Sequence, residues 1–421
     1  MKVLKFGGTS VGSAARIKEV AKLICDGEHK IVVLSAMSGT TNSLVEIADY
    51  YYKNNASGAI ERVNALEQKY YDVIDELYAE ETYKSAAAAL ISKHFEYLRT
   101  FANSVFTIFE EKAILAQGEL ISTGMFQIYL EEKGENSVLL PALDFMRIDK
   151  NSEPDTAFIA ENMAKQLEMN PGKTYYITQG YICRNFYGEI DNLQRGGSDY
   201  TASLIGAAIK AKEIQIWTDI DGMHNNDPRF VEGTRPVPYL NFEEAAELAY
   251  FGAKILHPTC ILPAKLNNIP VRLLNTMEPS APGTLISLKS NKQAIQAVAA
   301  KEGITAIKIK SGRMLLAYGF LRKVFEIFES YQTPIDMVTT SEIVDNLKKL
   351  GTVTVDRDQV IICVVGDLQP ENIGFQSRAV NAMRNIPVRM ISFGGSNYNV
   401  SFLIRAEDKK AALQALSTEL F

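Results

Sequence analysis

The stretch KVLKFGGTSVGS, residues 2–13, predicts the fold of the chain from its first turn. An apolar run, Val3–Phe6, ends at Gly7 and Gly8, and from about Ala14 apolar residues recur at helical spacing. This is the order strand, glycine turn, helix. Glycines let the backbone approach a ligand closely, and N–H groups that converge at a helix start attract an anion. The turn therefore suits a polyphosphate, although a tight connection without a ligand explains this stretch alone equally well.

Length, charge and cysteine content describe a globular chain. Its 421 residues suffice for about two to four domains, and a net charge of −6 argues against a general nucleic-acid binder. The four cysteines lie far apart and indicate neither a zinc site nor a disulfide framework, which favours the cytosol: Cys25, Cys183, Cys260 and Cys363. No apolar run reaches the roughly 18 residues of a membrane span, and no leader precedes the first strand, so we expect neither insertion nor export.

A second strand, residues 30–35, ends in a turn of small and hydroxyl-bearing residues that includes Ser35 and Thr41. In open α/β sheets ligands gather at the carboxyl ends of strands, so both turns are predicted to share one crevice; an ordinary loop is the alternative. Residues 43–115 show mainly helical spacing and are interpreted as a helical insertion. Glu119 then lies among small residues, which indicates a helix start. A carboxylate there is either stabilised by the helix N-terminus or placed to meet an ammonium group.

Residues 178–229 contain a second glycine turn and a strand that ends in acidic and hydroxyl groups. Arg195 precedes Gly196 and Gly197, and Asp199 follows them at the start of a helix rich in small residues. Phosphoryl transfer needs these parts, because its transition state requires positioning and cations rather than covalent chemistry. A surface ion pair explains each charged residue taken alone, but the set predicts a phosphate-handling site. P-loop spacing is absent, since the lysine of the first turn precedes its glycines.

Together these segments resemble the aspartokinases of the amino acid kinase family. The resemblance covers residues 1 to about 290 and rests on motifs in the family's order: KFGGTSVGS (5–13), GELIST (118–123), TQGY (178–181), RGGSDYTA (195–202), WTDIDG with NDPR (217–229) and GAKILHP (252–258). It implies an αβα sandwich around a mainly parallel eight-stranded sheet. It also implies ATP-dependent phosphorylation of the side-chain carboxylate of L-aspartate to 4-phospho-L-aspartate, the first step toward lysine, threonine and methionine.

The resemblance assigns roles by position. The phosphoryl group and ATP would be held by Lys5, Gly7, Gly8 and Ser10, with Asp199 orienting the cationic groups. L-Aspartate would be bound by Ser35, Thr41, Glu119, Arg195 and Ser198, with Arg195 on its α-carboxylate and Glu119 on its α-ammonium. The nucleotide would also contact Thr218, Asp219, His224, Arg229 and Lys254; His224 stands where the family often has tyrosine. Mg²⁺ is expected on the ATP oxygens, and no protein ligands are assigned to it.

From Ala299 onward the pattern changes to an internal repeat. Gly319-Phe320 aligns with Gly374-Phe375, and Pro334–Val338 aligns with Pro387–Ile391. The repeated unit resembles the ACT domain, an α+β βαββαβ module that senses amino acids. The resemblance therefore implies a tandem regulatory region and feedback inhibition, with a merely structural dimerisation module as the alternative.

The resemblance divides the chain into a catalytic domain at 1–295 and ACT domains at 296–421, with copies at about 299–357 and 358–421. The positions that hold lysine in lysine-inhibited members are matched by Met314, Gly319, Phe320, Leu321, Pro334, Ile335, Asp336, Ser341 and Glu342. Lysine is the favoured effector, threonine is possible, and a homodimer or homotetramer through the ACT domains is expected. The first copy has one strand fewer, so either a strand was lost or residues are omitted near 343.

Two other functions remain open. One is a kinase of the same fold for another acid, such as glutamate or a carbamoyl group; Glu119 and the tandem sensor argue against it. The other is a non-catalytic amino-acid sensor, which predicts damage at Lys5, Arg195 or Asp199. All three residues are present.

Overall fold

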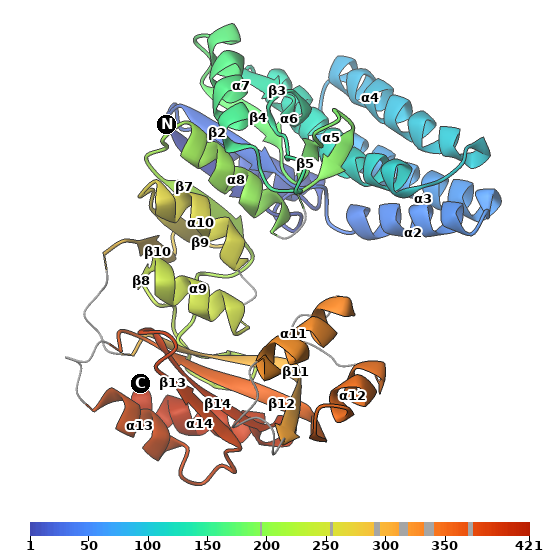
Figure 1. Cartoon of the computed structure of the whole chain (residues 1–421). Coiled ribbons are helices and arrows are strands. Elements are labelled where there is room, and N and C mark those ends of the chain that lie inside the picture. The colour runs from blue at the N-terminus through green and yellow to red at the C-terminus, as the bar shows by residue number, and fades with distance from the viewer. Residues whose placement is uncertain (194–195, 253–255, 290–294, 311–318, 332–340, 369–373) are drawn as a thin grey trace. The chain divides into compact units, whose positions relative to one another are not determined.

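The computed structural model describes residues 1–193, 196–252, 256–289, 295–310, 319–331, 341–368 and 374–421, with backbone only for 341 and 342 (Figure 1). The chain forms two compact units. The first consists of Met1–Met223, Pro238–Phe242 and Ile255–Ser290, and the second of His224–Val237, Glu243–Lys254 and Asn291–Phe421.

The first unit is built on an eight-stranded sheet with the strand order β3-β4-β2-β1-β7-β9-β10-β8. Its strands are β1 (Lys2–Phe6), β2 (Lys30–Leu34), β3 (Ser137–Leu140), β4 (Tyr175–Gln179), β7 (Ile214–Thr218), β8 (Tyr239–Asn241), β9 (Val271–Asn275) and β10 (Thr284–Ser287). All neighbouring pairs are parallel except β9 and β10. Strands buried on both faces need continuous apolar runs, as β1 and β2 have. The predicted mainly parallel eight-stranded sheet is confirmed.

Helices flank this sheet (Figure 1). The first, α1 (Ala14–Ile24), begins after Ser13, whose side chain accepts a hydrogen bond from the Arg16 N–H. α8 (Gly197–Ala208) packs on β1, β2 and β7. The unit also contains α6 (Ala142–Phe145), α7 (Thr156–Met169), α10 (Pro258–Leu266) and a small antiparallel pair, β5 (Ile182–Arg184) and β6 (Ile190–Asn192).

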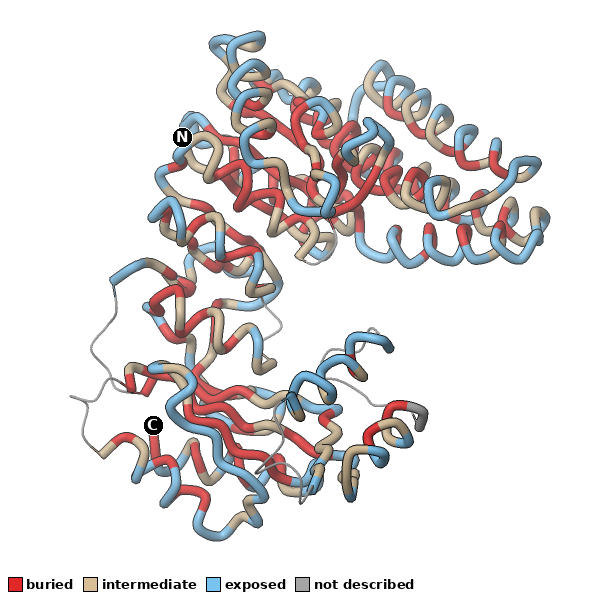
Figure 2. Tube along the Cα trace, viewed as in Figure 1, coloured by how far each residue is buried: buried red, intermediate tan, exposed pale blue. Residues whose placement is uncertain are grey.

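Four helices between β2 and β3 contain the segment interpreted as an insertion. They are α2 (Thr40–Tyr52), α3 (Ala56–Leu77), α4 (Glu81–Thr100) and α5 (Ile108–Glu132), with a short 3₁₀ turn, η1 (Phe101–Asn103). The apolar positions of α2, α3 and α4 recur at three- and four-residue spacing, so each of these three helices buries one side and exposes the other (Figure 2). α5 differs, because none of its residues from Ala113 to Leu130 is exposed. α5 also packs on β2, β3 and β4, which joins the helical layer to the sheet.

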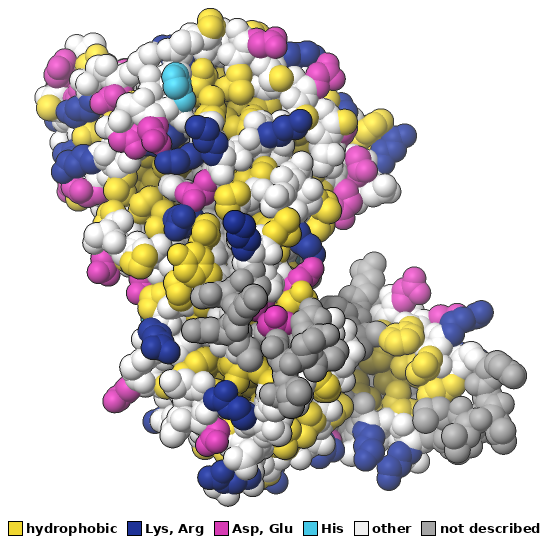
Figure 3. Space-filling view, turned by 90° about the vertical axis from the view of Figure 1, so that its left-hand side faces the viewer, with side chains coloured by type: hydrophobic (Ala, Val, Ile, Leu, Met, Phe, Trp, Pro, Cys, Tyr) yellow, Lys and Arg dark blue, Asp and Glu magenta, His cyan; other side chains and the backbone are white. Residues whose placement is uncertain are grey.

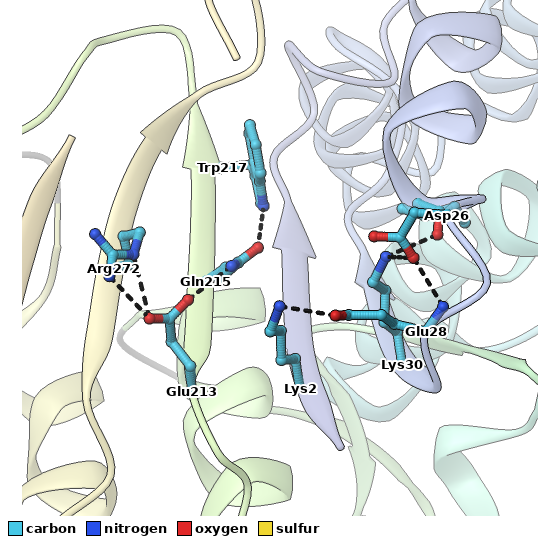
Figure 4. Close-up of polar contacts among 9 residues, drawn as sticks. Lys2, Asp26, Glu28, Lys30, Glu213, Gln215, Trp217 and Arg272 are labelled. Atoms are coloured by element: carbon cyan, nitrogen blue, oxygen red, sulfur yellow. Dashed lines mark hydrogen bonds and ion pairs between the residues drawn. The ribbon is translucent and has the colours of Figure 1, made fainter. Parts of the chain in front are cut away.

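Polar contacts tie neighbouring strands together near their amino ends (Figure 4). Lys2 Nζ donates to Glu28 Oε2 at 2.8 Å, and Arg272 Nη2 donates to Glu213 Oε2 at 3.1 Å. Both pairs join segments distant in sequence. The charged groups at the amino ends of the strands are thus paired with each other. A ligand is expected at the other end of the sheet, where the carboxyl ends of the strands lie.

The second unit contains a four-stranded antiparallel sheet with the order β11-β12-β14-β13. Its strands are β11 (Ala297–Lys310), β12 (Thr352–Val365), β13 (Met390–Phe393) and β14 (Asn399–Arg405). α13 (Phe375–Ala382) and α14 (Lys409–Leu420), which follows η2 (Ala406–Asp408), pack on one face of the sheet. The unit also includes most of α9 (Phe242–Tyr250). The predicted α+β arrangement is confirmed: β12, α13, β13, β14 and α14 follow in order, and β11 supplies the remaining strand.

β11 and β12 are long enough to serve both copies of the repeat. Ala297–Lys301 pairs with Ile361–Val365, and Ala306–Lys310 pairs with Thr352–Asp356. Beside the latter pairing, α11 (Phe320–Ser330) and α12 (Ser341–Lys348) form a small core of Phe328, Ile343 and Leu347. α12 spans residue 343, and residues 349–351 connect it to β12. A lost strand and omitted residues near 343 both stay predictions.

Candidate active site

One cavity of about 540 Å³ lies at the carboxyl ends of β1, β2 and β4. Its lining comes from five separate segments of the chain: Gly8, Thr9, Ser35, Ala36, Met37, Ser38, Gly39, Thr41, Asn42, Glu119, Tyr181, Gly197 and Ser198. The parallel pairing of β1 with β2 brings the two turns together, because it places Phe6 beside Leu34. The structure thus brings together five residues that the sequence analysis assigned to one site: Gly8, Ser35, Thr41, Glu119 and Ser198. We call this space the acceptor cavity.

Lys5 and Asp199 form an ion pair between the central strand and the first turn of α8. Lys5 Nζ lies 2.7 Å from Asp199 Oδ1, and both side chains are largely buried, 11% and 16% exposed. The Lys5 ammonium also lies 3.4 Å from the position that a Cβ at Gly7 would take, so it sits against the glycine turn. A buried lysine beside backbone N–H groups is suited to an incoming phosphoryl group, with Asp199 fixing its position.

Ser35 and Ser198 meet across the cavity. Ser35 Oγ donates to Ser198 Oγ at 2.9 Å, which joins the end of β2 to the start of α8. This close approach requires glycine at position 180, because a Cβ there would lie 2.4 Å from Ser198 Cβ and Oγ. α8 itself begins after Gly196, which has a φ of 88° that favours glycine.

Glu119 points into the cavity from the middle of a long helix, and the predicted helix start at this residue is wrong. α5 begins after Thr107, where Thr107 and Glu110 form a capping box, and continues to Glu132. The helix N-terminus therefore does not stabilise Glu119. The carboxyl group is 5% exposed, accepts a hydrogen bond from the Ala36 N–H at 3.2 Å, and burial raises its pKa to about 7. A cation that bound beside it would compensate this desolvation.

Tyr181 lines the same cavity and was missed by the sequence analysis. It follows β4 with a φ of 68°, an unusual value for a bulky residue. Its N–H donates to Thr201 Oγ1 at 2.9 Å, and its C=O accepts from the Leu193 N–H at 2.7 Å. These contacts hold the strained backbone at the cavity. The sequence signal was only the end of a strand followed by glycine, which does not reveal a left-handed conformation.

Other residues of the first unit lie outside the cavity lining. Ser10 is fully buried, and its Oγ lies 2.7 Å from Thr276 Oγ1. Its hydroxyl thus joins the first glycine turn to Thr276 and does not line the cavity. Thr218 ends β7, where its Oγ1 accepts from the Ile220 N–H at 3.1 Å, and Asp219 is exposed beside it.

The remaining nucleotide candidates lie in the second unit or outside the described residues. His224 Nδ1 lies 3.0 Å from Thr234 Oγ1. Arg229 forms two parallel hydrogen bonds with Asp227, at 2.9 and 2.6 Å, and this pairing lowers the pKa of Asp227 although burial opposes it. Arg195 and Lys254 lie outside the described residues.

Only part of the expected effector site is described. Gly319 has a φ of 82° and precedes α11, which begins with Phe320 and Leu321; Leu321 is 63% exposed. Ser341 and Glu342 form the first turn of α12. Met314, Pro334, Ile335 and Asp336 lie outside the described residues.

Three further observations concern alternative partners. No group of three or more His, Cys, Asp or Glu side chains among the described residues is placed to hold a metal ion. None of the described helices combines the length and apolar character of a membrane span. On the face shown in Figure 3, basic and acidic side chains are interspersed, without a continuous basic patch.

Comparisons with known proteins agree with this geometry. The model of the amino acid kinase family matches residues 1–275, and an ACT domain model matches residues 362–420. The chain is 33% identical to Aspartokinase 2, chloroplastic, of Arabidopsis thaliana, and the match covers 100% of this chain and 84% of that protein.

Two solved structures of Escherichia coli aspartokinase III are similar over the whole chain. The complex with aspartate and ADP (R-state) has a TM-score of 0.84 at 29% identity and covers 100% of both chains. The complex with lysine and aspartate (T-state) has a TM-score of 0.81 at 30% identity and covers 100% of this chain and 99% of that one. The chain therefore belongs to the amino acid kinase family and, within it, to the aspartokinases.

Proposed function

We propose that this protein transfers the γ-phosphoryl group of ATP to the side-chain carboxylate of L-aspartate, giving 4-phospho-L-aspartate and ADP. The observation that carries the proposal is the acceptor cavity, where the buried carboxyl of Glu119 lies with the Ser35–Ser198 pair at the strand ends. The complex of the E. coli relative with aspartate and ADP supports the same substrates. The product opens the route to lysine, threonine and methionine.

Roles follow from charge and position. Glu119 accepts the α-ammonium of aspartate, and Arg195 holds its α-carboxylate with two hydrogen bonds. Ser35, Thr41 and Ser198 orient the side-chain carboxylate so that one of its oxygens attacks the γ-phosphorus while the bond to the β-phosphate oxygen breaks. Lys5 neutralises charge on the moving phosphoryl group, Gly7 and Gly8 bring backbone N–H groups close to it, and Asp199 keeps Lys5 in place.

The proposed nucleotide contacts are Ser10 through its backbone, Thr218, Asp219, His224, Arg229 and Lys254. The described residues fit a Mg²⁺ ion held mainly by phosphate oxygens and water, because the Asp199 carboxylate is already paired with Lys5 and no group of three or more possible ligands occurs in the described part of the chain. When bound, this ion would neutralise the phosphate charge.

We further propose feedback inhibition through the ACT domains, with lysine as the favoured effector and threonine as the alternative. The lysine-bound complex of the E. coli relative supports this choice. The expected effector contacts are Gly319, Phe320, Leu321, Ser341 and Glu342 with the undescribed Met314, Pro334, Ile335 and Asp336. A homodimer or homotetramer is consistent with β13, an edge strand that exposes Met390, Ile391 and Phe393. The cytosol is the proposed compartment, since all four cysteines are free thiols.

The test is formation of an acyl phosphate. The purified protein is incubated with ATP, Mg²⁺ and either L-aspartate or L-glutamate, with hydroxylamine to trap the product, and with or without lysine or threonine. The proposal is supported if hydroxamate forms with L-aspartate but not with L-glutamate, and if the Lys5→Ala variant forms none. Product from glutamate indicates a kinase for another acid, and no ADP release with either acid indicates a non-catalytic sensor.

A further inference from the structure

Two neighbouring residues of α3 contact the turn that forms one wall of the acceptor cavity. We define residues 36–40 as the acceptor turn. From the exposed side, Lys69 Nζ donates to Ser38 O at 2.8 Å. From the buried side, the hydroxyl of Tyr70, which is fully buried, lies 2.8 Å from Thr40 Oγ1. The helical layer thus reaches the site, although no described residue of α3 lines the cavity.

Several hydrogen bonds hold the acceptor turn, and the backbone of Ser38 links it both to the first glycine turn and to α3. Its N–H donates to Gly8 O at 3.1 Å, and its C=O accepts from Lys69. The two peptide groups that flank Ser38 are therefore fixed between the glycine turn and α3. The next residue, Gly39, has a φ of 79°, and a Cβ there would lie 3.6 Å from Lys69 Nζ, so the ammonium lies directly against this backbone.

Lys69 also brings a charge that the cavity lining lacks. Within the described residues, the lining contains one carboxyl group, that of Glu119, and no lysine or arginine. Lys69 is exposed and has no carboxylate partner among the described residues. Its ammonium is therefore available to attract an acid with two carboxylates toward the cavity, with a strength that salt reduces.

We propose that Lys69 is a positioning residue for the anionic acceptor: it holds the acceptor turn through Ser38 and places an unpaired positive charge beside it. Tyr70 supports the same turn from within the core through Thr40. The inference rests on the proposed function, because it concerns the acceptor side of that reaction.

The test compares Lys69→Met with Lys69→Arg and with a matched control, Lys18→Met, in the full chain. Lys18 is suited to this purpose because its Nζ also donates from a helix, α1, to a backbone carbonyl, Glu76 O at 2.6 Å, and it does not line the cavity. For Lys69→Met, we expect the KM for aspartate to rise about 5- to 10-fold at low salt, with kcat changed less than about twofold and the KM for ATP unchanged. The difference should shrink with added KCl, and Lys69→Arg should retain most of the wild-type KM. Lys18→Met should match the wild type, and melting temperatures should agree among all variants.

Two results would overturn the inference. One is a KM for aspartate in Lys69→Met that equals that of Lys18→Met. The other is an equal rise of the KM for aspartate and the KM for ATP in Lys69→Met together with a lower melting temperature, which indicates a merely structural role. Calorimetric titration of the wild type with L-aspartate separates failure of the inference from failure of the proposed function. If the wild type neither binds nor turns over aspartate, the inference and the proposed function are both refuted. If the wild type turns over normally and Lys69→Met has the wild-type KM for aspartate, only the inference is refuted.

Discussion

The protonation of Glu119 predicts how aspartate binding depends on pH. Burial raises the pKa of this carboxyl group from 4.5 to about 7, and only the ionised form can accept the α-ammonium of aspartate. At pH 6 about one tenth of the free enzyme is then competent, so the KM for aspartate should be about tenfold higher than at pH 8. Glu119→Gln removes the charge, keeps the acceptor for the Ala36 N–H, and should abolish this dependence while raising the KM at pH 8.

Glu119→Gln should weaken aspartate binding but stabilise the fold at pH 8. Because the pKa of Glu119 is higher in the folded chain than in the unfolded one, its ionisation destabilises the fold progressively as the pH rises from about 4.5 to 7. Replacing it by glutamine should therefore stabilise the protein at pH 8 by at most about 3 kcal/mol, with little change at pH 4.5. Thermal melts at the two pH values measure this difference.

The assay is hydroxamate formation at saturating ATP, with aspartate varied at half-unit steps between pH 6 and 8. His94→Asn serves as the control, because His94 is a second titratable group near Glu119. His94 Nδ1 lies 2.7 Å from Oε1 of Gln117, which is on the same helix as Glu119, and burial lowers the pKa of His94. That variant should keep the wild-type pH dependence. A wild-type KM that stays constant from pH 6 to 8, or a Glu119→Gln variant with the wild-type slope, would refute the reasoning.

Three other substitutions test the rest of the site and the second unit. Lys5→Met should lower kcat about 10²- to 10³-fold in the hydroxamate assay, because it removes a cation from the phosphoryl group; a loss below about threefold would argue against that role. Gly180→Ala should raise the KM for aspartate about tenfold or more, since its Cβ would lie 2.4 Å from Ser198, and unchanged kinetics would show that the loop adapts. Asn226→Ala should lower the free energy of unfolding by about 1–2 kcal/mol in urea titrations, because Asn226 Nδ2 donates to Leu413 O at 3.0 Å in a buried position; an unchanged midpoint would contradict this.

Local patterns were sufficient for the framework of the site. The apolar run of β1, the glycines after it and the small residues of α8 each act within a few residues, so strand, turn and helix could be predicted in order. Parallel strands place their carboxyl ends together, which is why the turns that contain Gly8 and Ser35 could be assigned to one crevice. Ser198 was assigned to the same site only by the family resemblance. In the regulatory region the repeated Gly-Phe pairs marked helix starts at Phe320 and Phe375.

Errors arose where small residues resembled a helix boundary. The segment around Glu119 has weak helical signals, but the capping box at Thr107 starts the helix earlier, and packing of Gly118 against Ala36 and Thr40 requires small side chains inside it. The prediction mistook close packing for a helix start.

The sequence by itself determined the α/β class, the two glycine turns and the repeat, because these depend on apolar spacing and on the backbone freedom of glycine over short distances. Only the tertiary structure decided that Ser10 faces Thr276, that Tyr181 adopts a left-handed backbone conformation and that Lys69 reaches Ser38. Each of these depends on a contact between segments far apart in the chain or on a backbone angle held by such a contact. No local pattern records which side chain fills the space beside another strand or helix.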